Sequence, residues 1–179
     1  MIRPRNLNLR LSLAITLVLY LSPALAKPHE HGVAEFEISL SGKLLGLRLS
    51  APLDSLLGFE RAPRSEQEKN MYRQLRKDLL QYGLLVTLPT QAACTLESTE
   101  VSDPHDIDLT RPSAKAGSEH QDMVVEWQLR CESPGALKRI SFQGFDRYKR
   151  LRRVDAVFNT PSGLGKARLT SRQRDLQLP

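Results

Sequence analysis

The stretch HGVAEFEISLSGKLLGLRLS, from His31 to Ser50, decides the fold that the sequence predicts. In its first half the even positions are apolar and the odd positions are mostly polar, which is the alternation of a half-buried strand. Ser41 and Gly42 then predict a tight turn, and beyond them a leucine recurs at every second position. The chain is therefore predicted to open with a hairpin whose apolar side builds the core.

One helix is predicted after this hairpin. The connector from Ala51 to Arg64, APLDSLLGFERAPR, holds two prolines and a glycine, and it is expected to be irregular. Ser65 then precedes Glu68 by three residues, which is the pattern of a capping box. Apolar side chains recur at helical spacing up to Tyr82, and a glycine follows as a stop signal. The sequence predicts a single main helix over about residues 65–82.

The rest of the chain carries mostly strand signals, which are runs rich in apolar and β-branched residues with period two. These runs lie at residues 84–88, 94–101, 123–131, 139–142, 150–160 and 163–170, with a short tail after them. The predicted class is therefore α+β: a mainly antiparallel, sandwich-like β-sheet with one main α-helix packed on it.

Residues 1–26 have the features of a secretory signal peptide. A basic start is followed by an apolar run that is too short to span a bilayer comfortably, and the ALA that ends at Ala26 fits the rule for signal-peptidase cleavage. The mature chain, residues 27–179, has the size of a single domain. No later run is long enough to span a membrane, so a soluble periplasmic domain is predicted.

The charge of the chain argues against nucleic acid as a partner. The formal net charge of +6 falls by three, to +3, when the three arginines of the signal peptide leave. The basic run DRYKRLRR, residues 146–153, is interpreted as a solvated strand face, with a surface for an anionic partner or lipid headgroups as the alternative.

Cys94 and Cys131 are the two cysteines of the chain. Because exported proteins meet an oxidising compartment, they are predicted to form a structural disulfide.

Between the cysteines, residues 102–121 are polar, contain two prolines and show no period, so they are predicted to form a mobile surface loop. His105 stands in this loop among three aspartates and is a candidate metal ligand. A solvated loop is the simpler interpretation of this cluster.

No catalytic motif is present. The sequence has no GxSxG, HExxH, glycine-rich phosphate loop or CxxC. The carboxylate pair of Glu35 and Glu37 lies on a strand face with Arg48 opposite, and it is more simply explained as a set of solvent-facing charges. The protein is therefore predicted not to be an enzyme.

Two histidines at the start of the mature chain are the first metal candidates. His29 and His31 are two residues apart, so on an extended chain their side chains project to the same side. Neutral imidazoles favour zinc, copper or nickel, but zinc takes three or four protein ligands. The pair is therefore part of a metal site or simply exposed. Pro28 has no amide proton, which disfavours a square-planar copper site at the mature N-terminus.

A second pair of candidate ligands precedes another strand. His120 and Asp122 are also two residues apart, at the beginning of the run 123–131 and on its polar side. They could share one metal with His29 and His31 only if the beginnings of the two strands meet in space. A simple antiparallel pairing would place those beginnings at opposite ends.

Taken in order, these pieces resemble the ZrgA-like family of zinc-linked periplasmic proteins of Gram-negative bacteria, over essentially the whole mature chain. Three motifs carry the resemblance: HxHG at 29–32, GFExAPR at 58–64, and a histidine eleven residues before a cysteine, at His120 and Cys131.

The resemblance implies a periplasmic zinc-binding accessory protein that assists zinc acquisition or buffering, together with a zinc ABC importer or its solute-binding protein. The ligands it implies are His29, His31 and His120. Two departures imply fewer or weaker zinc sites than in relatives: the loop between the cysteines is short, and Arg61 stands where the family commonly has a histidine. The alternative is a structural or interaction module of the cell envelope that kept the fold and lost the metal.

Overall fold

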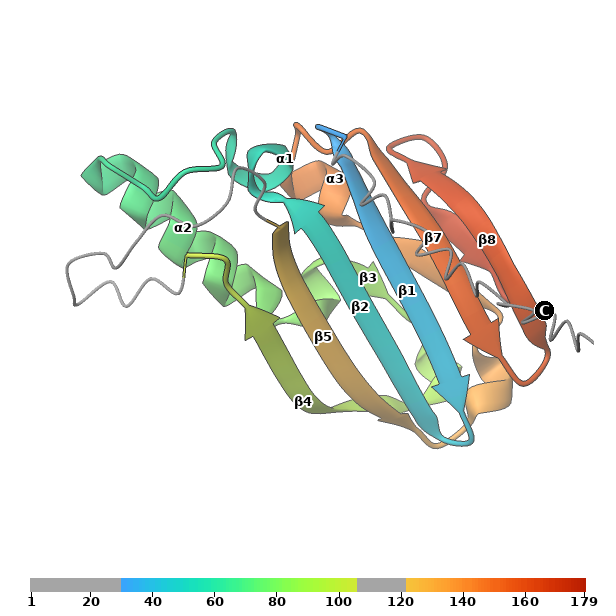
Figure 1. Cartoon of the computed structure of the whole chain (residues 1–179). Helices are drawn as coiled ribbons and strands as arrows, with labels where there is room; N and C mark the ends of the chain where they lie inside the picture. Colours follow the sequence, from blue (N-terminus) through green and yellow to red (C-terminus); the bar gives the residue numbers. More distant parts are fainter. Residues whose placement is uncertain (1–29, 106–121) are drawn as a thin grey trace, which may run out of the picture.

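The computed structural model describes residues 30–105 and 122–179, and its main element is a six-stranded sheet (Figure 1). The predicted signal peptide lies outside these residues. The strand order is β4-β5-β2-β1-β7-β8. The strands are β1 (Val33–Ser41), β2 (Leu44–Pro52), β4 (Cys94–Ser102), β5 (Asp122–Cys131), β7 (Arg153–Thr160) and β8 (Gly163–Thr170).

A second, smaller sheet and three helices complete the fold. The order of the small sheet is β3-β6-β9, and Figure 1 shows it with α2 on one side of the six-stranded sheet. The bounds are β3 (Val86–Thr87), β6 (Arg139–Phe142), β9 (Asp175–Gln177), α1 (Leu53–Leu57), α2 (Glu66–Leu79) and α3 (Gly144–Arg147). The prediction of a mostly β protein of α+β class is confirmed, although three short strands stand where a sandwich would have a full second layer.

The opening hairpin forms as the alternation predicts. β1 and β2 pair antiparallel, with Phe36 opposite Leu49 and Ile38 opposite Leu47. All four side chains are buried in the core, while the polar residues between them face solvent on the other side of the sheet. The alternation is therefore enough to fix both the register of the hairpin and its buried face.

β2 lies between β1 and β5 and runs antiparallel to both strands. β1 and β5 therefore point in the same direction and begin at the same end of the sheet. β7 pairs directly with β1 in parallel, so it begins there too. The sheet is thus not wholly antiparallel, and we refer to the end where β1, β5 and β7 begin as the site end.

The main helix packs on the sheet through a buried apolar face and one hydrogen bond. Tyr72, Leu75 and Leu79 of α2 are buried. The indole Nε1 of Trp127, on β5, donates to the carbonyl oxygen of Leu79 at 2.7 Å. Because that carbonyl belongs to the last turn of α2, where the helix leaves its own acceptors unpaired, this bond satisfies both partners and fixes where the helix ends against the sheet.

The boundaries of several elements differ from prediction. α2 ends at Leu79, and residues Tyr82–Leu84 form a separate 3₁₀ turn that leaves only two residues of the predicted strand at 84–88. A 3₁₀ turn repeats every three residues, so its spacing resembles a continuing helix. The connector also contains the helix α1, which is bounded by Pro52 and by Gly58 in the left-handed conformation. The same proline and glycine that suggested an irregular segment begin and end a short helix.

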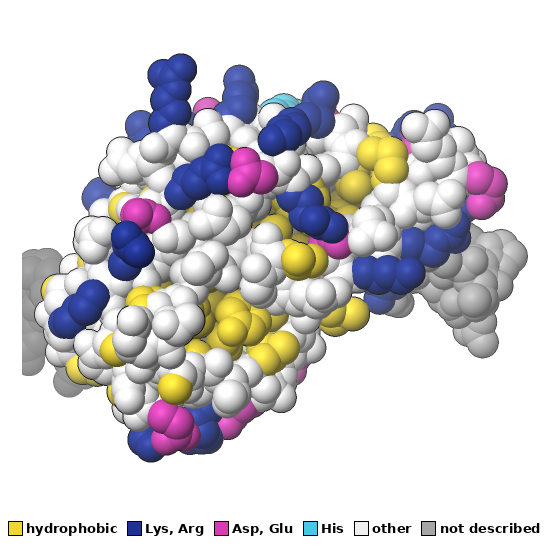
Figure 2. Space-filling view, turned by 180° about the vertical axis from the view of Figure 1, so that it is seen from behind, with side chains coloured by type: hydrophobic (Ala, Val, Ile, Leu, Met, Phe, Trp, Pro, Cys, Tyr) yellow, Lys and Arg dark blue, Asp and Glu magenta, His cyan; other side chains and the backbone are white. Residues whose placement is uncertain are grey.

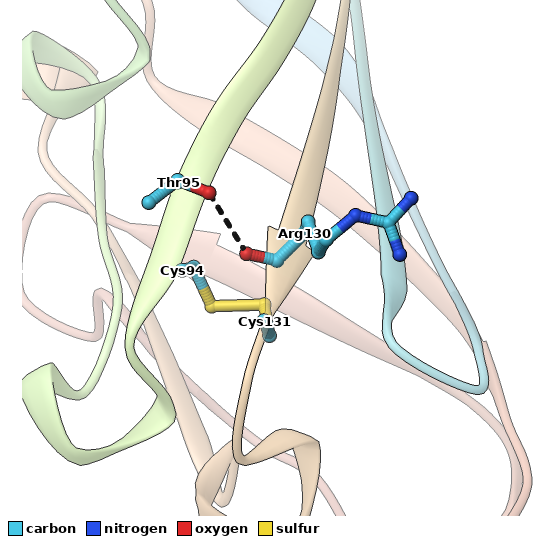
Figure 3. Close-up of a disulfide and its surroundings, with 4 residues drawn as sticks. All are labelled: Cys94, Thr95, Arg130 and Cys131. Carbon is cyan, nitrogen blue, oxygen red and sulfur yellow. Dashed lines mark hydrogen bonds between the residues drawn. A yellow bond between two sulfur atoms is a disulfide. The ribbon is translucent and has the colours of Figure 1, made fainter.

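The predicted disulfide is present and joins directly opposite residues (Figure 3). Cys94 on β4 is the register partner of Cys131 on β5. Next to the bridge, the hydroxyl of Thr95 donates to the carbonyl oxygen of Arg130 at 3.4 Å. Since β4 pairs only with β5 in this sheet, the bridge holds an edge strand in place.

The disulfide is expected to make a large contribution to stability. The free energy of unfolding of the double variant C94A/C131A should be about 4 kcal/mol lower than that of the parent. The bridge joins residues 37 positions apart in the sequence and so restricts the unfolded chain. Urea unfolding under oxidising conditions measures this difference. Reduction of the unmodified protein should produce a similar loss, and a variant as stable as the parent would contradict the expectation.

An ion pair between Arg61 and Glu68 joins the connector to the start of α2. Ser65 and Glu68 form the predicted capping box. Glu68 also receives two bonds from the guanidinium of Arg61, at 2.9 and 2.7 Å, and one from the backbone N–H of Arg64 at 2.7 Å. The bond from Arg61 and these backbone donors lower the pKa of Glu68 to about 2. Arg61 thus holds the connector in place.

The low pKa of Glu68 predicts a specific acid sensitivity. A folded-state pKa below the unfolded value adds stability above about pH 4.5, and this stability is lost as the pH falls toward about 2. Between pH 5 and pH 2 the melting temperature of E68Q should therefore fall less than that of the parent. E100Q, which removes an exposed carboxylate of β4, serves as the control. Parallel curves for the parent and E68Q would refute this role.

Candidate metal centre

The site end of the main sheet gathers groups from distant parts of the sequence. β1 begins at Val33, whose parallel partner is Arg153 at the start of β7. Asp122, the first residue of β5, is opposite Pro52 at the end of β2. The beginnings of β1, β5 and β7 therefore share this end with the helix α1, which follows β2 directly.

His31 lies at this end, beside two carboxylates. Its Nδ1 is 3.2 Å from Oδ2 of Asp54 and 3.6 Å from Oε1 of Glu60. Asp54 belongs to α1, and Glu60 follows it in the connector. The His31 side chain remains 63% exposed. The ring is therefore held on one side by carboxylates and accessible to solvent on the other.

His105 reaches the same residue, Glu60, from the end of β4. Its Nε2 is 2.7 Å from the carbonyl oxygen of Glu60, and its backbone N–H donates to Asp103 Oδ1 at 3.0 Å. The same oxygen of Asp103 accepts a hydrogen bond from the Tyr72 hydroxyl of α2. His105 is half-buried, so the first residues of the predicted loop are anchored on the body of the protein. Residues 106–121 lie outside the described part.

Asp122 is on the polar face of the sheet, as its position in the strand predicts. The hydroxyl of Ser50 donates to its Oδ2 at 3.1 Å. The other two candidates, His29 and His120, lie outside the described residues, so their part in a metal site stays a prediction. Of the predicted ligands, His31 lies beside the carboxylate of Glu60, His105 contacts the backbone carbonyl oxygen of the same residue, and Asp122 lies at the same end of the sheet.

Sequence reasoning missed Asp54 and Glu60. Both stand in the stretch read as an irregular connector, and Glu60 is part of the GFExAPR motif, which was the available signal. Within residues 30–105 and 122–179, no three histidine, cysteine or acidic side chains make a group that could hold a metal ion unaided. The carboxylates are better suited to orient the imidazole. A carboxylate at Nδ1 fixes the tautomer and leaves the Nε2 lone pair free for a metal.

Gly32 fixes the backbone next to His31. Its φ is +82°, a conformation that favours glycine. Its N–H donates to the hydroxyl of the fully buried Ser55 at 2.8 Å, and its carbonyl oxygen accepts from the backbone N–H groups of Arg152 and Arg153. A Cβ at this position would be 2.5 Å from Nε of Arg152. The glycine of the HxHG motif is therefore required by the packing.

The basic run at 146–153 has a different structure from the predicted strand face. It comprises the end of α3 and a connecting segment, and β7 begins only at its last residue, Arg153. Most of its arginines have specific partners: Arg147 pairs with Asp78, Arg150 with Asp54, and Arg153 with Glu30. Figure 2 shows Lys and Arg side chains along the edge of the molecule where a histidine reaches the surface.

These features define a class: a small, disulfide-bonded, β-rich protein that gathers imidazoles and carboxylates at one end of its main sheet. The family model described as ZrgA family zinc uptake protein matches residues 28–178, so the chain belongs to the ZrgA family. The resemblance found in the sequence is thereby confirmed. A comparison with curated proteins gives no match.

Family membership and the disulfide indicate an extracytoplasmic protein with a role related to zinc uptake. The family is one of zinc uptake and is not a known enzyme family. Among the described residues, no helix has the length and apolar character needed to cross a membrane.

Replacement of Gly32 tests its structural role. G32A should lower the free energy of unfolding by about 1–3 kcal/mol, because alanine strains the left-handed backbone and crowds Arg152. G83A is the matched control, since a Cβ at Gly83 meets nothing within 4 Å, and it should change stability by less than about 0.5 kcal/mol. Chemical unfolding measures both, and equal stabilities of G32A and the parent would contradict the assignment.

Proposed function

We propose that this chain is a periplasmic zinc-binding accessory protein that assists zinc acquisition or buffering. Its zinc site would use His29, His31 and His120, with His105 and Asp122 as further donors. The observation that carries the proposal is the contact of His31 and His105, from distant segments, with the same residue, Glu60.

The sheet topology supports a shared site for the two histidine pairs. Because β2 separates β1 from β5, the beginnings of these strands are two strand spacings apart, or about 10 Å. His29 and His31 precede β1, and His120 precedes β5 by two residues. Imidazole side chains that extend from two such points toward each other can reach one ion at the 2.0–2.1 Å that zinc requires.

The donor set fits zinc in its chemistry. Imidazole nitrogen with one carboxylate oxygen is a common combination for zinc, and a carboxylate that holds the far nitrogen of a ligating histidine is its usual support. His31 has such a carboxylate in Asp54. Since the described donors alone make no complete group, His29 and His120 would have to supply the remaining ligands.

The site is expected to be weaker than in relatives with a histidine at position 61. Both terminal nitrogens of Arg61 are bonded to Glu68, and a guanidinium does not ligate a cation at ordinary pH. Zinc release to a zinc ABC importer or to its solute-binding protein is consistent with such a site, because a carrier must give up its ion. The predicted signal peptide and the disulfide support the periplasm as the compartment.

Calorimetric titration with zinc at pH 7.5 tests the function on the mature protein. We expect saturable binding by the parent and its loss in the triple variant H29A/H31A/H120A, because three ligands are removed. E132Q, which removes an exposed carboxylate just beyond the far end of β5, should bind like the parent.

Two results would overturn the proposal. One is the absence of binding tighter than about 1 mM in the parent; the other is unchanged binding in the triple variant. Either result would favour the alternative of an envelope module that acts without metal.

A further inference from the structure

We propose that Arg150, which is not a metal ligand, is a positioning residue for His31: it fixes Asp54, and Asp54 fixes the imidazole. Arg152 completes the arrangement by holding the backbone of His31. This inference rests on the proposed zinc site, and it assigns a purpose to the basic run that precedes β7.

Arg150 forms two hydrogen bonds with Asp54. Its Nε donates to the backbone carbonyl oxygen of Asp54 at 3.0 Å, and its Nη2 donates to Oδ1 of the same residue at 2.9 Å. The other carboxylate oxygen, Oδ2, is the one that lies 3.2 Å from Nδ1 of His31. Each carboxylate oxygen thus has its own partner, and the carboxylate cannot rotate without the loss of one of these contacts.

Arg152 holds the same histidine from the backbone side. Its Nη2 donates to the carbonyl oxygen of His31 at 2.7 Å, and its side chain passes through the space that a Cβ on Gly32 would occupy. His31 is therefore fixed at its carbonyl by one arginine and at its ring, through Asp54, by another. Both arginines come from the segment that leads into β7, which the parallel pairing places beside the start of β1.

Cations beside a cation site need an explanation, because a positive charge repels zinc. The charge of Arg150 is balanced by its ion pair with Asp54, and the charge of Glu60 offsets that of Arg152, so the group around His31 carries no net positive charge. With its charge balanced, the remaining effect of Arg150 is to hold Asp54 in one orientation. The neutralised arginine therefore repels zinc only weakly, while the imidazole that it helps to orient is ready to bind the ion.

A role in orientation and a role through charge alone predict opposite results for the substitution R150M. If Arg150 acts by orientation, R150M should weaken zinc binding about 10-fold, the low end of the effect of removing a support behind a ligand. R150K keeps the charge but not the two-point contact, and it should fall between R150M and the parent. If the arginine acts only through its charge, R150M should bind zinc more tightly and R150K should match the parent.

A second test measures the coupling between Arg150 and Asp54. D54N should weaken zinc binding at least as much as R150M, and the double variant R150M/D54N should be no weaker than D54N alone, because both residues act through one contact. R139M is the matched control for charge: Arg139, at the start of β6, is 61% exposed and pairs with Asp175 of the small sheet. It should bind zinc like the parent.

A readout without metal separates this inference from the proposed function. In the zinc-free protein, the ¹⁵N and ¹H signals of the His31 ring should show the Nδ1–H tautomer in the parent and a mixture of tautomers in R150M. Thermal unfolding identifies any variant that fails to fold, in which case R150K supplies the comparison. A parent that binds no zinc but shows this shift would refute the zinc function and leave the positioning role standing. Unchanged tautomer and unchanged or tighter zinc binding in R150M would overturn the positioning role.

Discussion

The arrangement depends on one constraint, the position of β2 between β1 and β5. An antiparallel ladder on each side of β2 forces β1 and β5 to run in the same direction. Their beginnings therefore lie at the same end of the sheet, where His31 stands just before β1. Had β1 and β5 paired directly in an antiparallel ladder, the two ends would lie a strand length, about 30 Å, apart, and no single ion could connect them.

Once the strands begin at one end, short segments complete the site. The connector after β2 supplies Asp54 and Glu60 because it folds back over the end of the sheet, bounded by the helix α1 and by the Arg61–Glu68 pair. The segment before β7 supplies Arg150, which bonds to Asp54, and Arg152, which bonds to the carbonyl oxygen of His31. Three arginines of the basic run, Arg147, Arg150 and Arg153, thus form ion pairs that join this run to other segments of the chain.

Much of this protein was predictable from local patterns. The hairpin, the capping box of α2 and the strand with Trp127 each have signals confined to a few neighbouring residues, while the disulfide follows from the presence of two cysteines in a chain predicted to be exported; each is confirmed. The errors have local causes too: a 3₁₀ turn imitates the helix spacing near Tyr82, and a proline and a glycine that bound α1 suggested an irregular segment. Asp54 and Glu60 were missed because carboxylates in a connector carry no period that distinguishes a site from solvent.

The sequence by itself determined which faces are buried, where the main helix starts, which cysteines pair and to which family the chain belongs, because these properties follow from residue type and short-range spacing. The tertiary structure alone decided that β1 runs parallel to β7, that β2 separates β1 from β5, and that His31 and His105 contact the side chain and the backbone of Glu60. Contacts of this kind join residues dozens of positions apart. They depend on how the strands are ordered in the sheet, and no short stretch of sequence encodes that order.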